Sequence, residues 1–402
     1  MEKITVLGDF MVEPPFMQQV AKQGEYNFKP SFAPLKAILK ESDYVIGNLE
    51  TPLAGAERGY TERIVSFNSP DTLLDALVDI GVNAVSTANN HCVDRGLEGL
   101  MRTHETLDRY GIAHTGTYPE NYTGDRIHYF TVGNTTVALI AYTFAINYDI
   151  NKLPLEGAKK GCVNALRPLY GGTSLYARRP QSYYDTIELM KELLGRDLIW
   201  EETIKLQIAM HLPVPVIDNV IEGQKLEEYL AIIDADLQEA KKKADIVLFC
   251  PHVGGQFNED PGEYSKLFVK RCAELGFDGI FAAHSHTSQR AEFLEGKPCF
   301  YSMGNVSMSP GTFYSVSSCL PEYGLAAHLY VENNKIQKTT FSIFKMVEEG
   351  DEPMRIVPVD VLYDQLEGEA KEKLLADVSA VYRRVTCCEH SWNAPCKEYA
   401  LI

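Results

Sequence analysis

The sequence predicts an α/β protein, and two periodic patterns support this prediction. Short apolar runs bounded by Gly, Asn and Asp recur along the N-terminal third of the chain, as is typical of buried strands. Between these runs lie longer stretches whose apolar residues return every three or four positions, which is the spacing of amphipathic helices. Strands that alternate with helices along the chain indicate the α/β class.

The first predicted elements follow one another in a regular order. Helical patterns cover Pro70–Ile80 and Leu97–Tyr110. The strands are predicted at Ile4–Leu7, Tyr44–Ile46, Ala84–Ser86 and Val137–Ala141. Residues 147–215 then break the rhythm with prolines, paired glycines and arginines, which predicts an insertion that serves as a lid.

The regular pattern resumes after the insertion. A helix is predicted at 224–243, strands at Ile246–Cys250 and Gly279–Ala282, and short strands with turns over 291–345. A last helical pattern lies at Ala370–Arg383. We therefore expect one domain, with its insertion, at 1–345, followed by a C-terminal helical extension at 346–402.

The charge balance limits the partners. The formal net charge is -17 and the sequence pI is about 5.1. A surplus of negative charge disfavours long contacts with a phosphate backbone, so we expect no nucleic-acid partner. An anionic small molecule or polymer stays compatible as a substrate, because bound cations reverse the field inside a cleft.

Cysteine usage and the N-terminus favour a cytoplasmic location. The nine cysteines are odd in number and form no C-x-x-C pair, which argues against a disulfide framework and against a thiolate zinc site. The chain runs from Met1 almost directly into a predicted strand, and no apolar stretch is long enough to span a bilayer. We expect neither a signal peptide nor a membrane span; the oligomeric state stays open.

Metal-capable side chains stand at the carboxyl ends of five predicted strands. In α/β sheets ligands gather outside these ends. Carboxylate, amide and imidazole donors together suit zinc, iron or manganese. The residues are Asp9, Glu50, Asn89-Asn90-His91, His252 and His284-Ser285-His286. The pattern predicts that they converge on one metal site.

These residues belong to six blocks that stand in a fixed order. The blocks are Gly8-Asp9, Asn48-Leu49-Glu50, Asn89-Asn90-His91-Cys92-Val93-Asp94-Arg95-Gly96, His252-Val253-Gly254, His284-Ser285-His286 and Tyr301-Ser302-Met303-Gly304-Asn305. Over about residues 1–310 the order resembles the CapA-like (poly-γ-glutamate capsule synthesis) family of the calcineurin-like metallophosphatase superfamily. The resemblance implies a four-layer α-β-β-α sandwich.

The resemblance also implies roles for individual residues. His91 would be the catalytic acid and Asp94 its orienting carboxylate. Met11 stands where the wider superfamily often has a histidine ligand, which thins the first metal shell and leaves the number of divalent metal ions (Mn, Fe or Zn) at one or two. The implied ligands are Asp9, Glu50 and His286 for the first metal, and Asn90, His252 and His284, with Glu50 bridging, for the second.

Four further residues are candidates for contact with the substrate. They are Arg63, Asn89, Tyr264 and Asn305. A guanidinium suits bidentate binding of an anionic group, although a solvated surface arginine is an equal alternative for Arg63. Tyr264 and Asn305 lie in or beside the family blocks, where they line the cleft or pack its walls.

The predicted function is a metal-dependent hydrolase of the phosphoesterase type, linked by resemblance to capsule or poly-γ-glutamate metabolism. Two alternatives remain. The first is a non-catalytic binding or assembly protein of capsule synthesis that holds a metal structurally, and the second is a metal-dependent amidase that acts on γ-glutamyl bonds. The His91 and Asp94 pair favours an enzyme, since a structural site needs no such pair.

Overall fold

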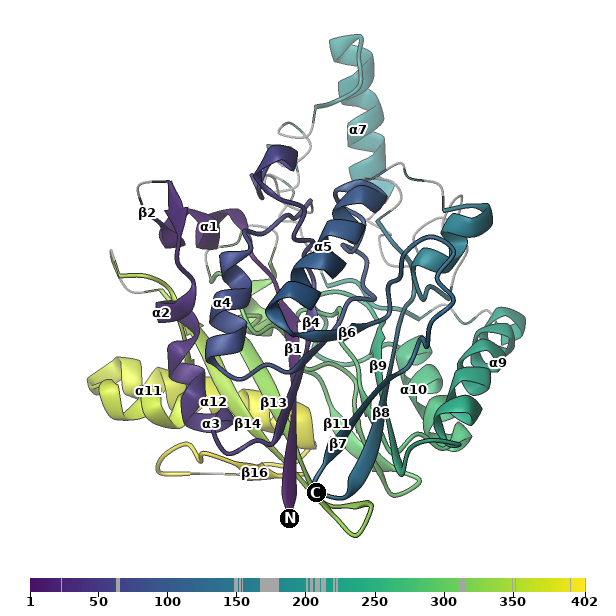
Figure 1. Ribbon diagram of the computed structural model, residues 1–402. Helices are drawn as coiled ribbons and strands as arrows, with labels where there is room; N and C mark the ends of the chain where they lie inside the picture. Colours follow the sequence, from purple (N-terminus) through teal and green to yellow (C-terminus); the bar gives the residue numbers. More distant parts are fainter. Residues whose placement is uncertain are drawn as a thin grey trace.

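A computed structural model shows two β-sheets packed face to face with helices on their outer surfaces (Figure 1). The structure describes residues 1–22, 24–62, 66–147, 151, 153, 155–166, 181–199, 202, 205–206, 210, 215–219, 221, 223–310, 312, 315–348, 350, 352–390 and 392–401.

The first sheet has eight strands in the spatial order β15-β14-β13-β1-β4-β5-β6, with β16 paired to β14. Its strands are β1 (Glu2–Phe10), β4 (Tyr44–Leu49), β5 (Ala84–Ser86), β6 (Ala113–Thr115), β13 (Tyr323–Glu332), β14 (Lys335–Val347), β15 (Arg355–Pro358) and β16 (Tyr399–Ala400). The strands β1, β4, β5 and β6 are parallel, so their carboxyl ends share one edge of the sheet.

The second sheet has six strands in the order β11-β12-β10-β9-β8-β7. Its strands are β7 (His128–Val132), β8 (Thr135–Thr143), β9 (Ile246–His252), β10 (Gly279–Phe281), β11 (Ala291–Leu294) and β12 (Lys297–Phe300). Here β8, β9, β10 and β12 are parallel. A separate hairpin pairs β2 (Ala21–Lys22) with β3 (Glu25–Tyr26).

Alternating side chains explain why the two sheets face each other. Val6 of β1 and Leu139 of β8 point into the shared core between the sheets, together with Ile246 of β9. The next residues along β1 and β8, Leu7 and Ile140, point outward into separate clusters under the helices. Strands with apolar residues on both faces are buried on both faces, which is what these runs of Val, Ile and Leu predict.

Helices close both outer faces. The outer face of the first sheet packs against α1 (Pro14–Val20), α2 (Lys29–Phe32), α3 (Lys36–Leu39), α4 (Thr72–Asp79) and α5 (Gly96–Tyr110). The outer face of the second sheet packs against α9 (Gly223–Ala240) and α10 (Glu263–Leu275). Short 3₁₀ turns are η1 (Ala33–Leu35), η2 (Ala56–Arg58), η3 (Gly157–Cys162) and η4 (Ser317–Cys319). The predicted four-layer α-β-β-α sandwich is confirmed.

The C-terminal residues cover the part of the first sheet that extends past the second. Helices α11 (Val359–Gln365) and α12 (Gly368–Thr386) pack into the central core. The ring of Phe341 in β14 stacks on the ring of Tyr382 in α12, with 6.2 Å between the ring centroids. Residues 355–400 also supply β15 and β16, so they contribute strands as well as helices. The division of the chain into 1–345 and 346–402 stays a prediction.

The short strands predicted over 291–345 are present only at the start of that range, as β11 and β12. Further along, the prediction was wrong, because the chain forms the long hairpin β13–β14, whose turn contains Asn333 and Asn334 with φ of 53° and 61°. Asparagine is one of the few residue types that readily adopt a left-handed backbone. A two-residue turn with this backbone matches the twist of the strands that it joins. The short strands β6 and β7 were not predicted.

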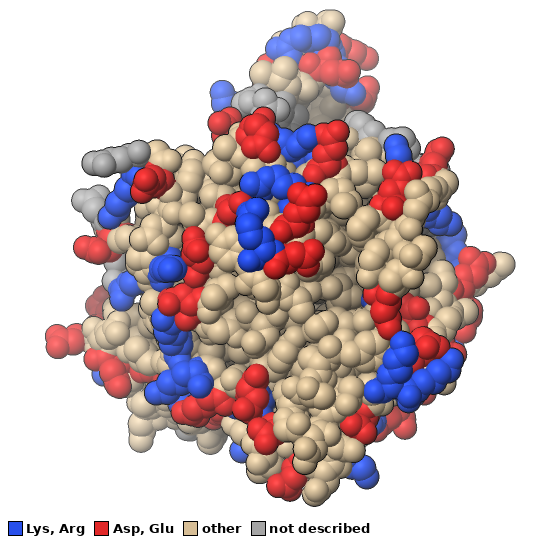
Figure 2. All heavy atoms as spheres, in the orientation of Figure 1, with Lys and Arg blue, Asp and Glu red and all other residues tan. Residues whose placement is uncertain are grey.

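Only parts of the predicted insertion are described, and they include α7 (Gln181–Leu194), which stands away from the body in Figure 1. In the ranges given above, no helix combines the length and apolar character needed to cross a membrane. All nine cysteines are free thiols. On the face shown in Figure 2, acidic and basic side chains lie together over α5, where Arg102 pairs with Asp71 at 2.8 Å.

The packing of α12 predicts a large effect on stability. We expect Leu374→Ala to lower the free energy of unfolding by about 2–5 kcal/mol, because the buried side chain leaves a cavity in the central core. Urea denaturation measures the change. Leu193→Ala on α7 is the control, since that side chain is 76% exposed and its loss should change the value by less than about 0.5 kcal/mol. Equal effects of the two substitutions would contradict this packing.

Candidate metal centre

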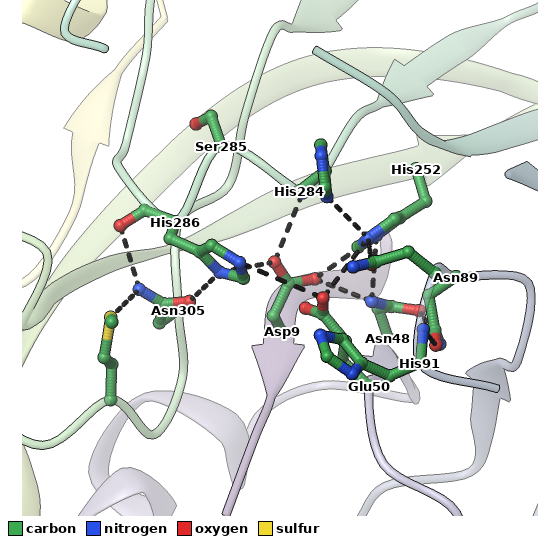
Figure 3. Close-up of polar contacts among 12 residues, drawn as sticks. Asp9, Asn48, Glu50, Asn89, His91, His252, His284, Ser285, His286 and Asn305 are labelled. Carbon is green, nitrogen blue, oxygen red and sulfur yellow. Dashed lines mark hydrogen bonds and ion pairs between the residues drawn. The ribbon is translucent and has the colours of Figure 1, made fainter. Parts of the chain in front are cut away.

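The carboxyl ends of both sheets meet at one place, and the predicted metal ligands lie there (Figure 3). Two groups of three side chains bring their donor atoms within 4.8 Å of one another. The groups are Asp9, Glu50 and His286, and Glu50, His252 and His284. Glu50 belongs to both groups, the position that the resemblance implies for a bridging carboxylate. The ligand roles themselves stay predictions.

Two buried carboxylates form the centre of the site. Asp9 lies near the end of β1 and Glu50 directly follows β4, and neither side chain is exposed to solvent. Burial, and then the charge of Glu50, raise the pKa of Asp9 well above its usual range. Burial opposes ionisation of Glu50 too, but His252 and His286 hold the pKa of Glu50 below its ordinary value.

The second group is completed by Asn90. Its Oδ1 lies 2.7 Å from Nε2 of His252, which in turn lies 3.1 Å from Nδ1 of His284 and 3.3 Å from Oε1 of Glu50. Burial, followed by the two neighbouring histidines, lowers the pKa of His284 well below its usual range. A neutral imidazole is the form that binds a metal ion.

In the first group, His286 is held by Asn305. Nδ1 of His286 lies 2.9 Å from Oδ1 of Asn305, and the Asn305 Nδ2 donates to the His286 carbonyl at 2.9 Å. The imidazole therefore donates from Nδ1 and keeps Nε2 for the site, as the partners of metal-binding histidines usually arrange. Asp9 lies 3.8 Å from the ring.

The residues present fit a divalent cation. Both oxygens of the Glu50 carboxylate are buried, and neither accepts a hydrogen bond from any residue that the structure describes. A buried carboxylate without donors is costly unless a cation balances it. The four side chains grouped with it offer one carboxylate and three imidazoles, and no cysteine is among them. The donor set therefore suits zinc, iron or manganese.

Close backbone contacts bring the ligands together. Asp9 donates its backbone N–H to the Gly304 carbonyl at 3.1 Å, and a Cβ on Gly8 would lie only 1.9 Å from that oxygen. This contact explains the glycine of the Gly8-Asp9 block. His284 and His286 have φ of 102° and 56°, in the left-handed region that residues with side chains rarely occupy, and such strain is typical of functional sites.

His91 and Asp94 form a pair beside the metal ligands. Nδ1 of His91 lies 2.6 Å from Oδ2 of Asp94, which also accepts the backbone N–H of Phe67 at 2.7 Å. Burial opposes protonation of the ring, but the Asp94 carboxylate raises the pKa of His91 above its ordinary value. The carboxylate thus fixes the tautomer of the His91 ring and leaves its Nε2 free of the Asp94 contact.

The predicted substrate contacts have mixed outcomes. Arg63 lies outside the described residues. The side chain of Asn89 is buried and donates to the Leu49 carbonyl at 2.8 Å, so it holds the turn after β5. Tyr264 packs into the core of the second sheet, with its ring 4.9 Å from that of Phe144. Asn305 contacts His286 at 2.9 Å, and its role toward a substrate stays a prediction.

Several supporting residues were missed by the sequence analysis. Asn48 donates to Asp9 at 2.7 Å; its place in the Asn48-Leu49-Glu50 block was a signal that pointed to it. Asn147 and Asn151, at the start of the insertion, contact His91 and Asp94 and belong to no motif.

The residues just after the predicted insertion also contact a loop of the site. Asp218 accepts the backbone N–H groups of Gly255, Gly262 and Ser265 at 3.1, 3.1 and 2.9 Å, so it anchors the loop that follows His252 to the start of α10. Val216 forms an antiparallel bridge to the same loop at Gln256. Nothing in the sequence around Asp218 marks it for this role.

Comparison with known proteins gives the family of the chain. The family described as "Bacterial capsule synthesis protein PGA_cap" matches residues 3–309. The chain is 22% identical to "PGA biosynthesis protein CapA" of Bacillus subtilis over 73% of this chain and 60% of that one. It is 21% identical to "Capsule biosynthesis protein CapA" of Bacillus anthracis over 80% and 63%. The match thus spans about three fifths of these relatives' length.

Solved structures give weaker matches. One is a putative 5'-nucleotidase from Staphylococcus aureus in complex with alpha-ketoglutarate, with a TM-score of 0.41, 14% identity, and coverage of 94% of this chain and 58% of that one. Another is a novel phosphatase from Mycoplasma pneumoniae, with a TM-score of 0.39, 12% identity, and coverage of 91% and 97%. These scores are too low to define a shared fold. The match to the family over residues 3–309 places the chain in the bacterial capsule synthesis protein family.

Proposed function

We propose that the chain is a metal-dependent hydrolase of the phosphoesterase type that acts on an anionic substrate in capsule or poly-γ-glutamate metabolism. One observation carries the proposal: the His91–Asp94 pair, at 2.6 Å, lies directly beside the metal-capable carboxylates and histidines. A structural metal site needs only the ligands. A histidine tied to a buried carboxylate beside them supports catalysis rather than binding alone.

The side chains divide the chemical work. Asp9, Glu50 and His286, with Asn90, His252 and His284, would hold one or two divalent ions. A bound ion would supply a water of lowered pKa and would neutralise charge on the anionic substrate. Asn305 and Asn48 keep His286 and Asp9 in place through the hydrogen bonds described above.

His91 would act as the general acid. Asp94 holds Nδ1, so Nε2 would present a proton to the leaving-group oxygen. Burial opposes protonation of the ring, but the Asp94 carboxylate raises the pKa of His91, which favours the protonated form that an acid needs. The same residues suit hydrolysis of a γ-glutamyl amide, in which the leaving group is an amine, and only the substrate separates that reaction from phosphoester hydrolysis.

Metal binding should stabilise the fold. We expect Mn²⁺ at a concentration of about 100 times its Kd to raise the free energy of unfolding of EDTA-treated protein by about 2.7 kcal/mol. Glu50→Gln should lose this increase, because it removes the charge shared by both ligand groups. Thermal unfolding with and without MnCl₂ measures the shift. Glu332→Gln, at an exposed position, serves as control. An unchanged melting temperature for the unsubstituted protein would refute the metal site.

Loss of the acid should reduce turnover without loss of metal. For His91→Ala we expect kcat on bis-p-nitrophenyl phosphate to fall by about 10²–10⁴-fold, with metal content unchanged by elemental analysis. His390→Ala, an exposed histidine in the C-terminal part, should retain activity. Bound metal with turnover of a γ-glutamyl p-nitroanilide alone would indicate the amidase. Bound metal without turnover of either substrate would indicate a binding protein.

The Asp94 carboxylate should set the pH range of activity. Its charge raises the pKa of His91, so the acid loses its proton only at higher pH. We therefore expect Asp94→Asn to shift the alkaline limb of the kcat profile to lower pH. A profile measured between pH 5 and 10 with bis-p-nitrophenyl phosphate tests this. An alkaline limb that stays in place in the variant would assign it to another group.

A further inference from the structure

Asn147 lies just after β8, where the predicted insertion begins, and its amide contacts two residues of the site. We propose that Asn147 is a positioning residue that orients the side-chain amide of Asn90 toward the metal centre. The inference rests on the proposed metal-dependent function. Among the described residues, the side chain of Asn147 contacts Asn90 and His91.

The two asparagines are paired through two hydrogen bonds. The backbone N–H of Asn147 donates to the Asn90 carbonyl at 2.9 Å, and Nδ2 of Asn90 donates to Oδ1 of Asn147 at 3.2 Å. The first bond fixes where Asn147 lies along the turn after β5. The second bond holds Nδ2 of the Asn90 amide and so determines where Oδ1 of the same amide points.

The direction of the Asn90 amide matters because its two ends differ. Only Oδ1 has lone pairs for a cation, whereas Nδ2 carries two hydrogens and would repel one. A half turn of the amide exchanges them at almost no cost in volume. By accepting from Nδ2, Asn147 keeps Oδ1 on the side of His252, 2.7 Å from its Nε2, where the second ligand group lies.

The other end of the Asn147 amide has a lesser role. Its Nδ2 lies 3.3 Å from Nδ1 and 3.4 Å from Nε2 of His91, almost equidistant from both ring nitrogens. Nδ1 already donates its hydrogen to Asp94 and has no lone pair for the amide, and a donor almost equidistant from both ring nitrogens is poorly aligned with Nε2. This contact is therefore packing against the ring, and Oδ1 is the end of Asn147 that directs Asn90.

Metal affinity separates these roles. EDTA-treated protein is titrated with CoCl₂ and the visible absorption of bound Co²⁺ is followed. We expect Asn147→Ala to weaken Co²⁺ binding by about 10–100-fold, the effect typical of residues that orient metal ligands. Asn147→Asp keeps an oxygen acceptor and should bind as the unsubstituted protein does. Asn151→Ala, which removes only the contact of its amide with Asp94, should also keep its affinity.

A double-mutant cycle distinguishes a loss of Asn90 orientation from a general loss of structure in Asn147→Ala. In Asn90→Asp both ends of the side chain are oxygens, so no orientation is needed, and Asn147→Ala should then change Co²⁺ affinity by less than about threefold. A tenfold or larger loss in that background would overturn the proposal, as would unchanged affinity in Asn147→Ala alone. Failure of the unsubstituted protein to bind Co²⁺ would instead refute the proposed function.

Discussion

Two carboxylates buried side by side set the conditions for the rest of this structure. Asp9 and Glu50 lie where the carboxyl ends of the parallel strands of both sheets meet, away from water. Removal of a carboxylate from water costs several kcal/mol even after the protein relaxes. Histidine rings from the second sheet lie against the carboxylates of the first, so the electrostatic balance of the centre joins the two halves of the sandwich.

The positions of the candidate ligands where the two sheets meet depend on the backbone as much as on side chains. The contact between Gly8 and Gly304 leaves no space for a methyl group, and it brings the loop after β12 onto the end of β1. Left-handed backbone at His284 and His286 turns two alternate side chains to the same side. The free energy for this strain comes from the apolar clusters above and below each sheet, which fix the ends of the loops.

The sequence was most informative where a local pattern carried the signal. A polar residue directly after an apolar run marked the strand ends, and this gave the α/β class and the candidate ligands Asp9 and His252 before any contact was known. Contacts between distant segments left no such pattern. The pairing of Asn305 with His286, and the anchoring of the loop after His252 by Asp218, arise only when separate segments pack together.

Lengths of elements were harder to predict than their presence. The pattern after residue 291 contains turn residues and β-branched residues in mixture, and it did not reveal that β13 and β14 form one long hairpin. Strands as short as β6 carry too few residues for an alternating pattern to stand out. For Tyr264 the sequence left open whether the side chain lines the cleft or packs its walls, and only the structure shows the ring in the core of the second sheet.

The inserted segment is fastened to the centre at both of its ends. Asn147 and Asn151 hold its beginning against His91 and Asp94, and Val216 and Asp218, which directly follow it, bind the loop after His252. Changes in the sequence between these two places would therefore leave the contacts that position His91 and the loop after His252 intact.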